Sequence, residues 1–212
     1  MIISELSGGL GNQLFEYAAA HSLARRHGTT IAMNLFAYTQ DKLRQYLLDA
    51  YALPQNFASE AECNALRGNR LYASGRLRRL LPLPANPHLY IEPHFHYDAA
   101  FEHLGDEVYL RGYFQSERYF ADYADEERKL FTLQQLPESA MSSQIQQAEM
   151  PVSLHVRRGD YVAIQAVLAQ HGTASTDYYE RAIAIIRALY PKASFFVFSD
   201  DIPWVREHMG FI

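Results

Sequence analysis

The sequence predicts an α/β protein made of two units, and three observations lead to this prediction. Residues 1–34 follow the order strand, helix, strand, with a glycine-rich turn after the first strand. The same order returns after Pro151. Between the two, residues 137–151 are polar and small with a proline at each end, which is typical of a linker. We therefore expect one domain over residues 1–150 and a second over residues 151–212, facing each other across a cleft.

Composition narrows the classes of protein to consider. The chain has 212 residues, 49% of them hydrophobic, which is enough for a sizeable core and excludes a disordered chain. Its net charge of −5 gives no global case for nucleic-acid or anionic membrane binding. The single cysteine, Cys63, excludes an intrachain disulfide and a cysteine-based zinc cluster, and fits a reducing compartment.

Targeting and membrane-spanning segments are recognised by their composition. No basic signal-peptide segment precedes the first strand, and no apolar run is long enough to span a bilayer. We expect a soluble, cytoplasmic protein without a transmembrane segment, and leave peripheral membrane contact open.

The first motif is the turn S-G-G-L-G-N-Q at the start of an alanine-rich helix. A strand-to-helix junction offers free backbone N–H groups and a positive dipole end to an anionic ligand. The dinucleotide fingerprint G-x-G-x-x-G fits at Gly9 and Gly11 but meets Leu14 at its third position, and no lysine follows as in a P-loop. The plainer interpretation is a tight turn with Asn12 as the helix N-cap. The adjacent carboxamide of Gln13 favours a binding site slightly.

The middle of the chain carries weaker signals. Residues 29–35 are expected to form the second strand, and S-E-A-E-C-N-A-L-R-G a short capped helix that ends at Gly68. Residues 63–91 are rich in arginine and proline and contain no acid. This segment is either a solvated basic flap, which we favour, or a surface for a polyanionic acceptor or lipid headgroups. Residues 107–120 predict a strand that ends in an aromatic loop, followed by an amphipathic helix.

The second motif, H-V-R-R-G-D-Y-V, ends the first strand of the second unit. Ligands of open α/β sheets bind beyond the carboxyl ends of strands. There Arg157 and Arg158 suit a diphosphate, and Asp160 could orient an arginine or accept a proton from an attacking hydroxyl. The alternative is an ion pair of Asp160 with either arginine on a surface turn, with His155 in the core. Asp200 and Asp201 end the next strand, where the plainer role of Asp201 is a helix cap.

Four blocks, G-G-L-G-N-Q-L-F-E-Y-A, L-R-G-Y-F-Q-S-E-R-Y-F, H-V-R-R-G-D-Y-V and F-F-V-F-S-D-D, occur in this order along the chain. In this the chain resembles the alpha-1,2-fucosyltransferase family, glycosyltransferase family 11. The resemblance implies a GT-B-like architecture of two Rossmann-like domains. It also implies transfer of L-fucose from GDP-fucose to the 2-hydroxyl of a galactose-terminated glycan, with inversion and without a metal ion or other cofactor.

The resemblance also implies roles for single residues. Arg157 would bind the donor diphosphate, Arg158 would support it, His155 would lie near the nucleotide, and Asp160 would hold the arginines or serve the acceptor hydroxyl. The other side of the cleft would place glycines and carboxamides close to donor and acceptor. The residues expected in the donor site on this basis are His155, Arg157, Gly9, Gly11, Gln13, Ser199 and Asp200, and those expected in catalysis are Arg157, Arg158, Asp160 and Asn12.

Members of that family continue well beyond the S-D-D block, whereas this sequence stops at Ile212. We therefore expect the second domain to be incomplete, with uncovered sheet edges and apolar faces. A non-catalytic remnant with at most weak nucleotide or glycan binding is the alternative to an active enzyme. A generic nucleotide-binding module of another activity is a third hypothesis, which the four ordered blocks disfavour.

Overall fold

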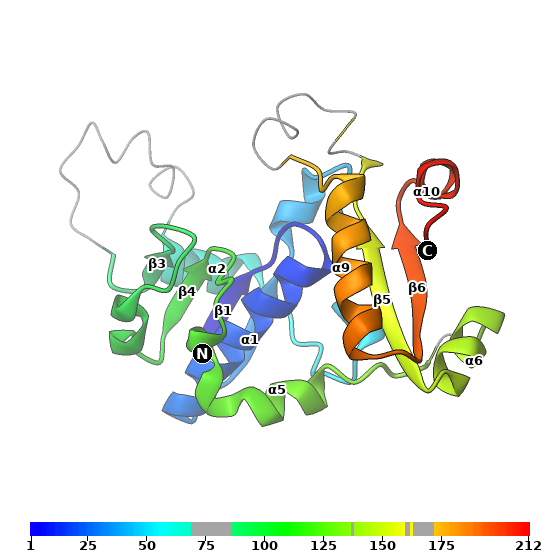
Figure 1. Cartoon of the computed structure of the whole chain (residues 1–212). Coiled ribbons are helices and arrows are strands. Elements are labelled where there is room, and N and C mark those ends of the chain that lie inside the picture. The colour runs from blue at the N-terminus through cyan, green and yellow to red at the C-terminus, as the bar shows by residue number, and fades with distance from the viewer. Residues whose placement is uncertain (69–85, 137, 160–161, 163–171) are drawn as a thin grey trace. The chain divides into compact units, whose positions relative to one another are not determined.

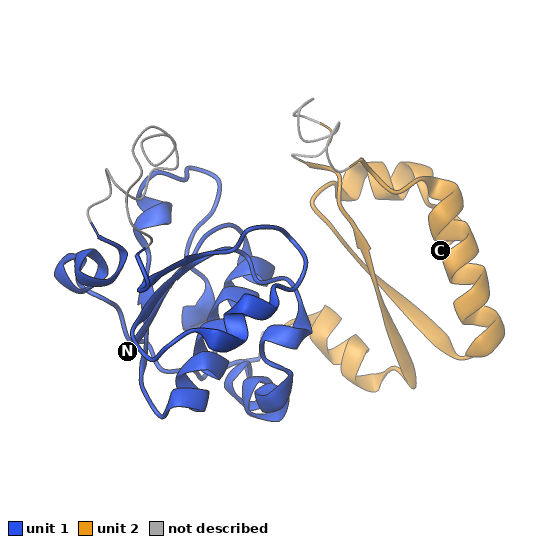
Figure 2. Cartoon of the chain, turned by 90° about the vertical axis from the view of Figure 1, so that its left-hand side faces the viewer, with its two compact units in different colours: residues 1–136 blue, residues 137–212 orange. Residues whose placement is uncertain are grey.

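The computed structural model describes residues 1–68, 86–136, 138–159, 162 and 172–212. The chain divides into two compact units, residues 1–136 and residues 137–212 (Figures 1 and 2). The division falls at the start of the polar segment, whereas the sequence placed the domain boundary at residue 150. Much of the expected linker is helical, and this helix belongs to the second unit.

The first unit alternates helices with short parallel strands. In chain order, with η for 3-10 helices, its elements are β1 (Ile2–Glu5), α1 (Leu10–His27), β2 (Ile31–Asn34), η1 (Phe36–Thr39), η2 (Leu48–Ala50), α2 (Glu60–Arg67), β3 (Leu89–Ile91), η3 (Ala99–His103), β4 (Val108–Arg111), η4 (Glu117–Tyr119), η5 (Ala121–Tyr123) and α5 (Ala124–Leu130). The strands form one sheet in the order β2-β1-β4-β3, and every pairing is parallel. The α/β class and the opening strand–helix–strand are confirmed.

Side chains of the sheet alternate between two apolar layers. Ile2 packs on one face with Tyr17 and Leu23 of α1, whereas Ile3 packs on the other with Cys63 of α2. All of these side chains are at most 2% exposed. Burying a large apolar side chain contributes about 1.5–3 kcal/mol, so these two layers stabilise the sheet from both faces.

Local signals explain where the helices begin and end. Ser59 and Glu62 form a reciprocal capping box at α2, which ends at Gly68 as expected. The expectation that Asn12 caps α1 is wrong, because the left-handed φ of 69° at Gly8 turns the chain early and Gly9 becomes the N-cap. In the second unit, the hydroxyl of Ser175 caps the helix α9 (Thr176–Leu189) by accepting from the backbone N–H of Tyr178.

The second unit contains a two-stranded parallel sheet. Its elements are α6 (Ala140–Gln147), β5 (Met150–Val156), α9 (Thr176–Leu189), β6 (Ala193–Ser199) and α10 (Ile202–His208). Val156, Tyr179, Val205 and Met209 form its buried cluster. Other large apolar side chains are exposed, among them Ile185, Leu189 and Phe198.

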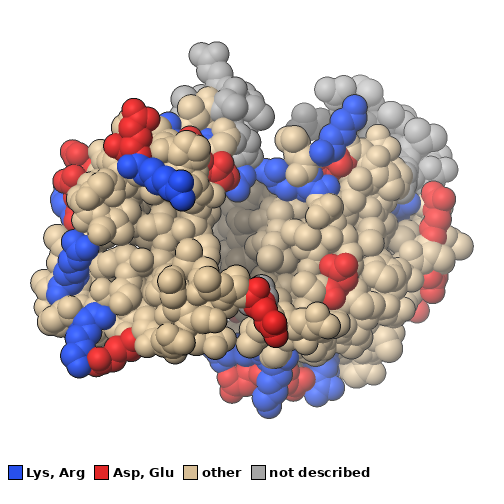
Figure 3. Space-filling view, turned by 90° about the vertical axis from the view of Figure 1, so that its right-hand side faces the viewer, with Lys and Arg blue, Asp and Glu red and all other residues tan. Residues whose placement is uncertain are grey.

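The described surface carries both signs of charge. On the face in Figure 3, Lys and Arg side chains are interspersed with Asp and Glu side chains. None of the helices in the described part of the chain is long and apolar enough to cross a membrane. The arginine-rich stretch of residues 69–85 lies outside the described residues, so its two interpretations stay open.

Candidate functional site

The glycine-rich turn lies directly beyond the carboxyl end of β1. The N-cap, Gly9, supplies no side-chain hydrogen bond to the first turn of α1, where Gly11 and Asn12 lie. Position 8 favours glycine because of its φ of 69°, and the Asn12 side chain packs close to it: a Cβ atom at Gly8 would lie 2.4 Å from Nδ2 of Asn12. The turn therefore presents uncapped backbone N–H groups at a helix N-terminus, which suits an anionic or polar ligand.

Gln13 is placed differently from the expectation. Its side chain is fully buried, and its Nε2 donates to the backbone oxygens of Gln45, at 2.8 Å, and Gly8, at 3.3 Å. Its Oε1 accepts from the backbone N–H of Leu47 at 2.9 Å. Both N–H groups are thus occupied inside the unit, which corrects the expectation that Gln13 lines a ligand cleft. Gln13 positions the turn by tying it to residues 45–47.

Sequence reasoning missed Glu16, which lies one helical turn after Asn12. Its carboxyl group is fully buried and receives hydrogen bonds from the backbone N–H and the hydroxyl of Ser7, each at 2.8 Å. Burial raises the pKa of Glu16 to about 8, so the carboxyl is mainly protonated at neutral pH. The one signal in the sequence was an acidic residue within an otherwise apolar helix face.

The loop that follows β4 contacts the glycine-rich turn at the carboxyl edge of the sheet. Gln115, in the loop after β4, donates through Nε2 to Oδ1 of Asn12 at 2.8 Å, across 103 residues of sequence. Phe114 in this loop is fully buried with a φ of 49°. A non-glycine residue in this region stores strain that the surrounding packing must hold.

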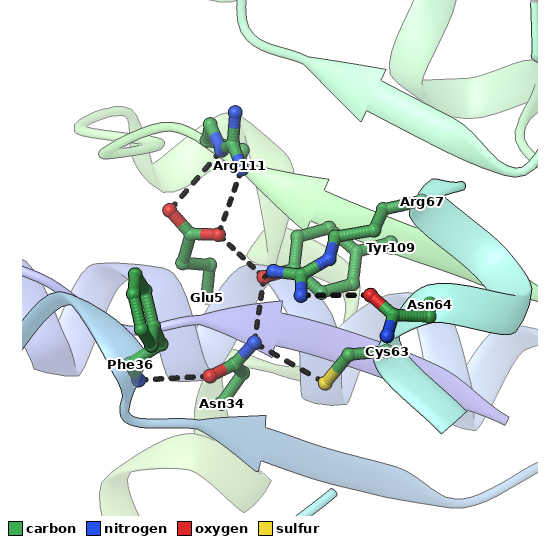
Figure 4. Close-up of polar contacts among 8 residues, drawn as sticks. All are labelled: Glu5, Asn34, Phe36, Cys63, Asn64, Arg67, Tyr109 and Arg111. Carbon is green, nitrogen blue, oxygen red and sulfur yellow. Dashed lines mark hydrogen bonds and ion pairs between the residues drawn. The ribbon is translucent and has the colours of Figure 1, made fainter. Parts of the chain in front are cut away.

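Beside this loop, Glu5 and Arg111 form a bidentate ion pair, shown in Figure 4. Nε and Nη2 of Arg111 lie 3.1 and 3.0 Å from the two carboxylate oxygens. Tyr109 donates its hydroxyl proton to the same carboxylate. Burial, reinforced by Glu5, raises the pKa of Tyr109, which therefore stays a neutral donor.

In the second unit, two arginines and two aspartates follow paired strands. Nε of Arg157 lies 3.3 Å from Asp200, and Nε of Arg158 lies 3.3 Å from Asp201. The Arg158 guanidinium also lies over the ring of Trp204, with Cζ 3.7 Å from the ring centroid. Asp160, the partner expected from the sequence, lies outside the described residues.

Backbone groups fix the aspartates. Asp200 accepts from the backbone N–H of Arg158 at 2.8 Å, and a Cβ atom at Gly159 would lie 2.7 Å from its Oδ2. Partial burial alone would raise the pKa of Asp200, but the N–H groups of Arg158 and Gly159, with the Arg157 guanidinium, lower it overall. Asp201 accepts from Trp204 N–H and caps α10, as its plainer interpretation suggested.

Ser199 joins the two strand ends. Its hydroxyl donates to the backbone oxygen of Val156 at 2.7 Å and accepts from the backbone N–H of Asp201 at 2.9 Å. Ser199 therefore holds together the ends of β5 and β6, which precede the two arginines and the two aspartates.

A pocket of about 500 Å³ lies beside these groups, lined by His155, Arg157, Thr173, Tyr178 and Tyr179 among others. This volume is in the range of small-molecule sites. The hydroxyl of Tyr179 donates to the backbone oxygen of His155 at 3.3 Å, while the histidine side chain is exposed. His155 is therefore a pocket residue, against its alternative placement in the core. Across the part of the chain that the structure describes, no cluster of three or more His, Cys, Asp or Glu residues could hold a metal ion.

Gln13 and Asn12 should respond differently to truncation. Gln13→Ala removes three buried hydrogen bonds to backbone groups, and we expect a loss of about 2–4 kcal/mol in the free energy of unfolding. Asn12→Ala removes one bond to an exposed partner and should cost about 1 kcal/mol or less. Urea unfolding followed by far-UV circular dichroism measures both. Equal stability of the two variants would contradict the positioning role of Gln13.

Glu16 should make the stability of the first unit depend on pH. Its pKa in the folded chain lies above the ordinary 4.5, so the folded state holds a proton that the unfolded chain releases between about pH 4.5 and 8. The free energy of unfolding should therefore fall as pH rises through this window, by up to about 5 kcal/mol. Glu16→Gln should remove this dependence, whereas Glu117→Gln on the surface should keep it. An unchanged pH profile in Glu16→Gln would show that the carboxyl does not titrate in this way.

Similar proteins were found by family, sequence and structure. Residues 96–212 match the model described as Glycosyl transferase family 11. An alpha-1,2-colitosyltransferase of Escherichia coli is 27% identical over 210 residues, which cover 98% of this chain and 71% of that protein. Galactoside alpha-(1,2)-fucosyltransferase 2 of Sus scrofa is 27% identical over 213 residues, which cover 96% of this chain and 54% of that protein.

Among solved structures, NodZ alpha-1,6-fucosyltransferase soaked with GDP-fucose aligns with 100% of this chain and 74% of its own, at 17% identity and a TM-score of 0.46. The family model spans more than half of the sequence. This chain belongs to glycosyl transferase family 11.

Proposed function

We propose that this chain carries the site of an inverting glycosyltransferase that moves L-fucose from GDP-fucose to the 2-hydroxyl group of a galactose-terminated glycan. Family membership supports transfer of a glycosyl group. The relatives named for α-1,2 transfer align with 98% and 96% of this chain, which supports the linkage. The second of these relatives is named for a galactoside acceptor, which supports the same class of acceptor for this chain.

The observation that carries the donor site is the pair Arg157 and Arg158 at the carboxyl end of β5. Both guanidiniums are held by aspartates, and Arg157 lines the 500 Å³ pocket. In the proposed reaction the acceptor hydroxyl oxygen forms a bond to the anomeric carbon while the bond to the β-phosphate oxygen breaks. GDP then leaves with increased negative charge. Fixed guanidiniums stabilise this charge without a metal ion or another cofactor.

The remaining residues take supporting roles in this proposal. His155, Ser199 and Asp200 belong to the donor side, and Asp160 either holds the arginines or accepts the acceptor proton. Gly9, Gly11 and Asn12 belong to the acceptor-side domain, where Gln13 acts through the turn that it positions. The two units are proposed to be Rossmann-like domains of a GT-B-like enzyme, the first on the acceptor side and the second on the donor side.

A second candidate differs in the sugar. Because one relative is named a colitosyltransferase and covers nearly this whole chain, transfer of colitose from its nucleotide is an alternative to transfer of fucose.

For the compartment, we propose the cytoplasm, with peripheral membrane contact left open. The single cysteine, buried at 2% exposure, is compatible with this environment.

The donor site is tested by Arg157→Ala, with Arg206→Ala on the exposed face of α10 as the control. We expect Arg157→Ala to lose about 3 kcal/mol of transition-state stabilisation, roughly a hundredfold in rate, and to bind GDP more weakly. Arg206→Ala should keep both properties. The measurements are fucosylated product, released GDP and calorimetric GDP titration, with and without a chelator.

Each outcome separates the candidates. Near-normal transfer by Arg157→Ala would remove this arginine from the site, and a strict need for a divalent metal would contradict charge neutralisation by arginines. GDP binding that depends on Arg157, without transfer from any donor, would favour the non-catalytic remnant.

A further inference from the structure

A second pocket lies in the first unit, at the carboxyl end of β2 and against α2. It has a volume of about 340 Å³, and its walls include Asn34, Phe36, Phe57, Glu60, Cys63 and Arg67. We call it the Arg67 pocket. Its size is at the small end of ligand sites, which corresponds to a single ring rather than a nucleotide.

The polar groups behind this pocket form one cluster with an uneven charge balance (Figure 4). The cluster contains two guanidiniums, of Arg67 and Arg111, and one carboxylate, of Glu5. Arg111 occupies both oxygens of that carboxylate. Among the described residues, Arg67 contacts neutral groups: Oδ1 of Asn64 at 3.0 Å, the Tyr109 hydroxyl at 3.5 Å, and the face of the Tyr109 ring. Within this cluster the positive charge of Arg67 therefore has no carboxylate to balance it.

This charge is buried. Arg67 is 2% exposed, its Nε is buried without a hydrogen-bond partner, and no carboxylate of the described residues lies within ion-pair distance of its guanidinium. A buried cation without a counter-charge is costly, and folded proteins rarely keep one. Arg111 shows in the same cluster what satisfies such a group: a carboxylate held by Nε and one Nη.

The walls of the pocket indicate the rest of the ligand. Phe36 and Phe57 are 37% and 48% exposed, so each presents part of its aromatic ring to solvent. The polar groups of Asn34 and Arg67 line the same pocket. Aromatic faces beside a few fixed polar groups suit a ring with apolar C–H faces and polar edges. Glu60, the acidic wall residue, is exposed, so water screens its charge far more than that of Arg67.

We propose that the Arg67 pocket binds a monosaccharide-sized ligand that carries a carboxylate, with the carboxylate against the Arg67 guanidinium and the ring against Phe36 and Phe57. This site is separate from the proposed donor site, because it lies within the first unit and involves no nucleotide. Its test therefore uses no GDP-sugar, and it can fail while the proposed transfer stands.

The probes are D-glucuronate, with galactose as the neutral sugar and acetate as the carboxylate without a ring. Titration of the whole 212-residue chain, followed by NMR, should give glucuronate an affinity at least tenfold above either control. Arg67→Met should weaken glucuronate binding at least tenfold. Arg128→Met, the same change at an exposed ion pair on α5, should leave it unchanged.

A second measurement covers the case in which Arg67→Met does not fold. In the unmodified chain the Arg67 Nε–H signal should shift on addition of glucuronate, and Arg67→Lys should bind it more weakly while keeping the fold. Equal binding of glucuronate and galactose, full binding by Arg67→Met, or an unmoved Nε–H signal at saturating glucuronate would each overturn the proposal.

Discussion

Parallel pairing brings the carboxyl ends of neighbouring strands to one edge of a sheet, and in both units arginines and acidic side chains form ion pairs at that edge. In the first unit Glu5 pairs in register with Asn34, and Ser4 pairs with Leu110, so Arg111 comes next to Glu5. In the second unit Val156 pairs with Ser199. The two arginines that follow Val156 therefore run beside the two aspartates that follow Ser199. A shift of one register position would separate both sets of ion pairs.

Buried polar contacts hold the loops above the first sheet. Gln13 ties the glycine-rich turn to residues 45–47, Glu16 holds Ser7, and the Tyr38 hydroxyl donates to the backbone oxygen of Gly8 at 3.2 Å. Each contact costs conformational entropy to form, but together they fix the turn before any ligand arrives. A ligand that binds to an already ordered turn binds more tightly, because little conformational entropy of the turn remains to be lost. The buried contacts of the first unit would therefore affect the affinity of any ligand at this turn.

Local sequence patterns predicted the opening strand–helix–strand, the short capped helix that ends at Gly68, and the strand that Arg157 follows. They could not predict the partners of the polar residues. Glu5 and Arg111 are 106 residues apart in sequence, and Asn12 and Gln115 are 103 apart, so only the sheet topology brings them together. Gln13 was predicted to bind a ligand because no local pattern reveals its hydrogen bonds to the backbone of Gln45 and Leu47. The assignment of Arg157 and Arg158 to the donor diphosphate, and of Asp200 to the donor site, stays a prediction.

For the proposed binding of a nucleoside diphosphate at Arg157 and Arg158, the chain contains its own spectroscopic reporter. Trp204 is the single tryptophan, and the Arg158 guanidinium lies 3.7 Å from its ring centroid. A diphosphate that draws Arg158 toward itself must change this contact. Titration with GDP should therefore change the tryptophan fluorescence in a saturable way that weakens with added salt, while guanosine, which lacks the phosphates, should leave it unchanged. An identical response to guanosine, or none to GDP at millimolar concentration, would contradict diphosphate binding at Arg157 and Arg158.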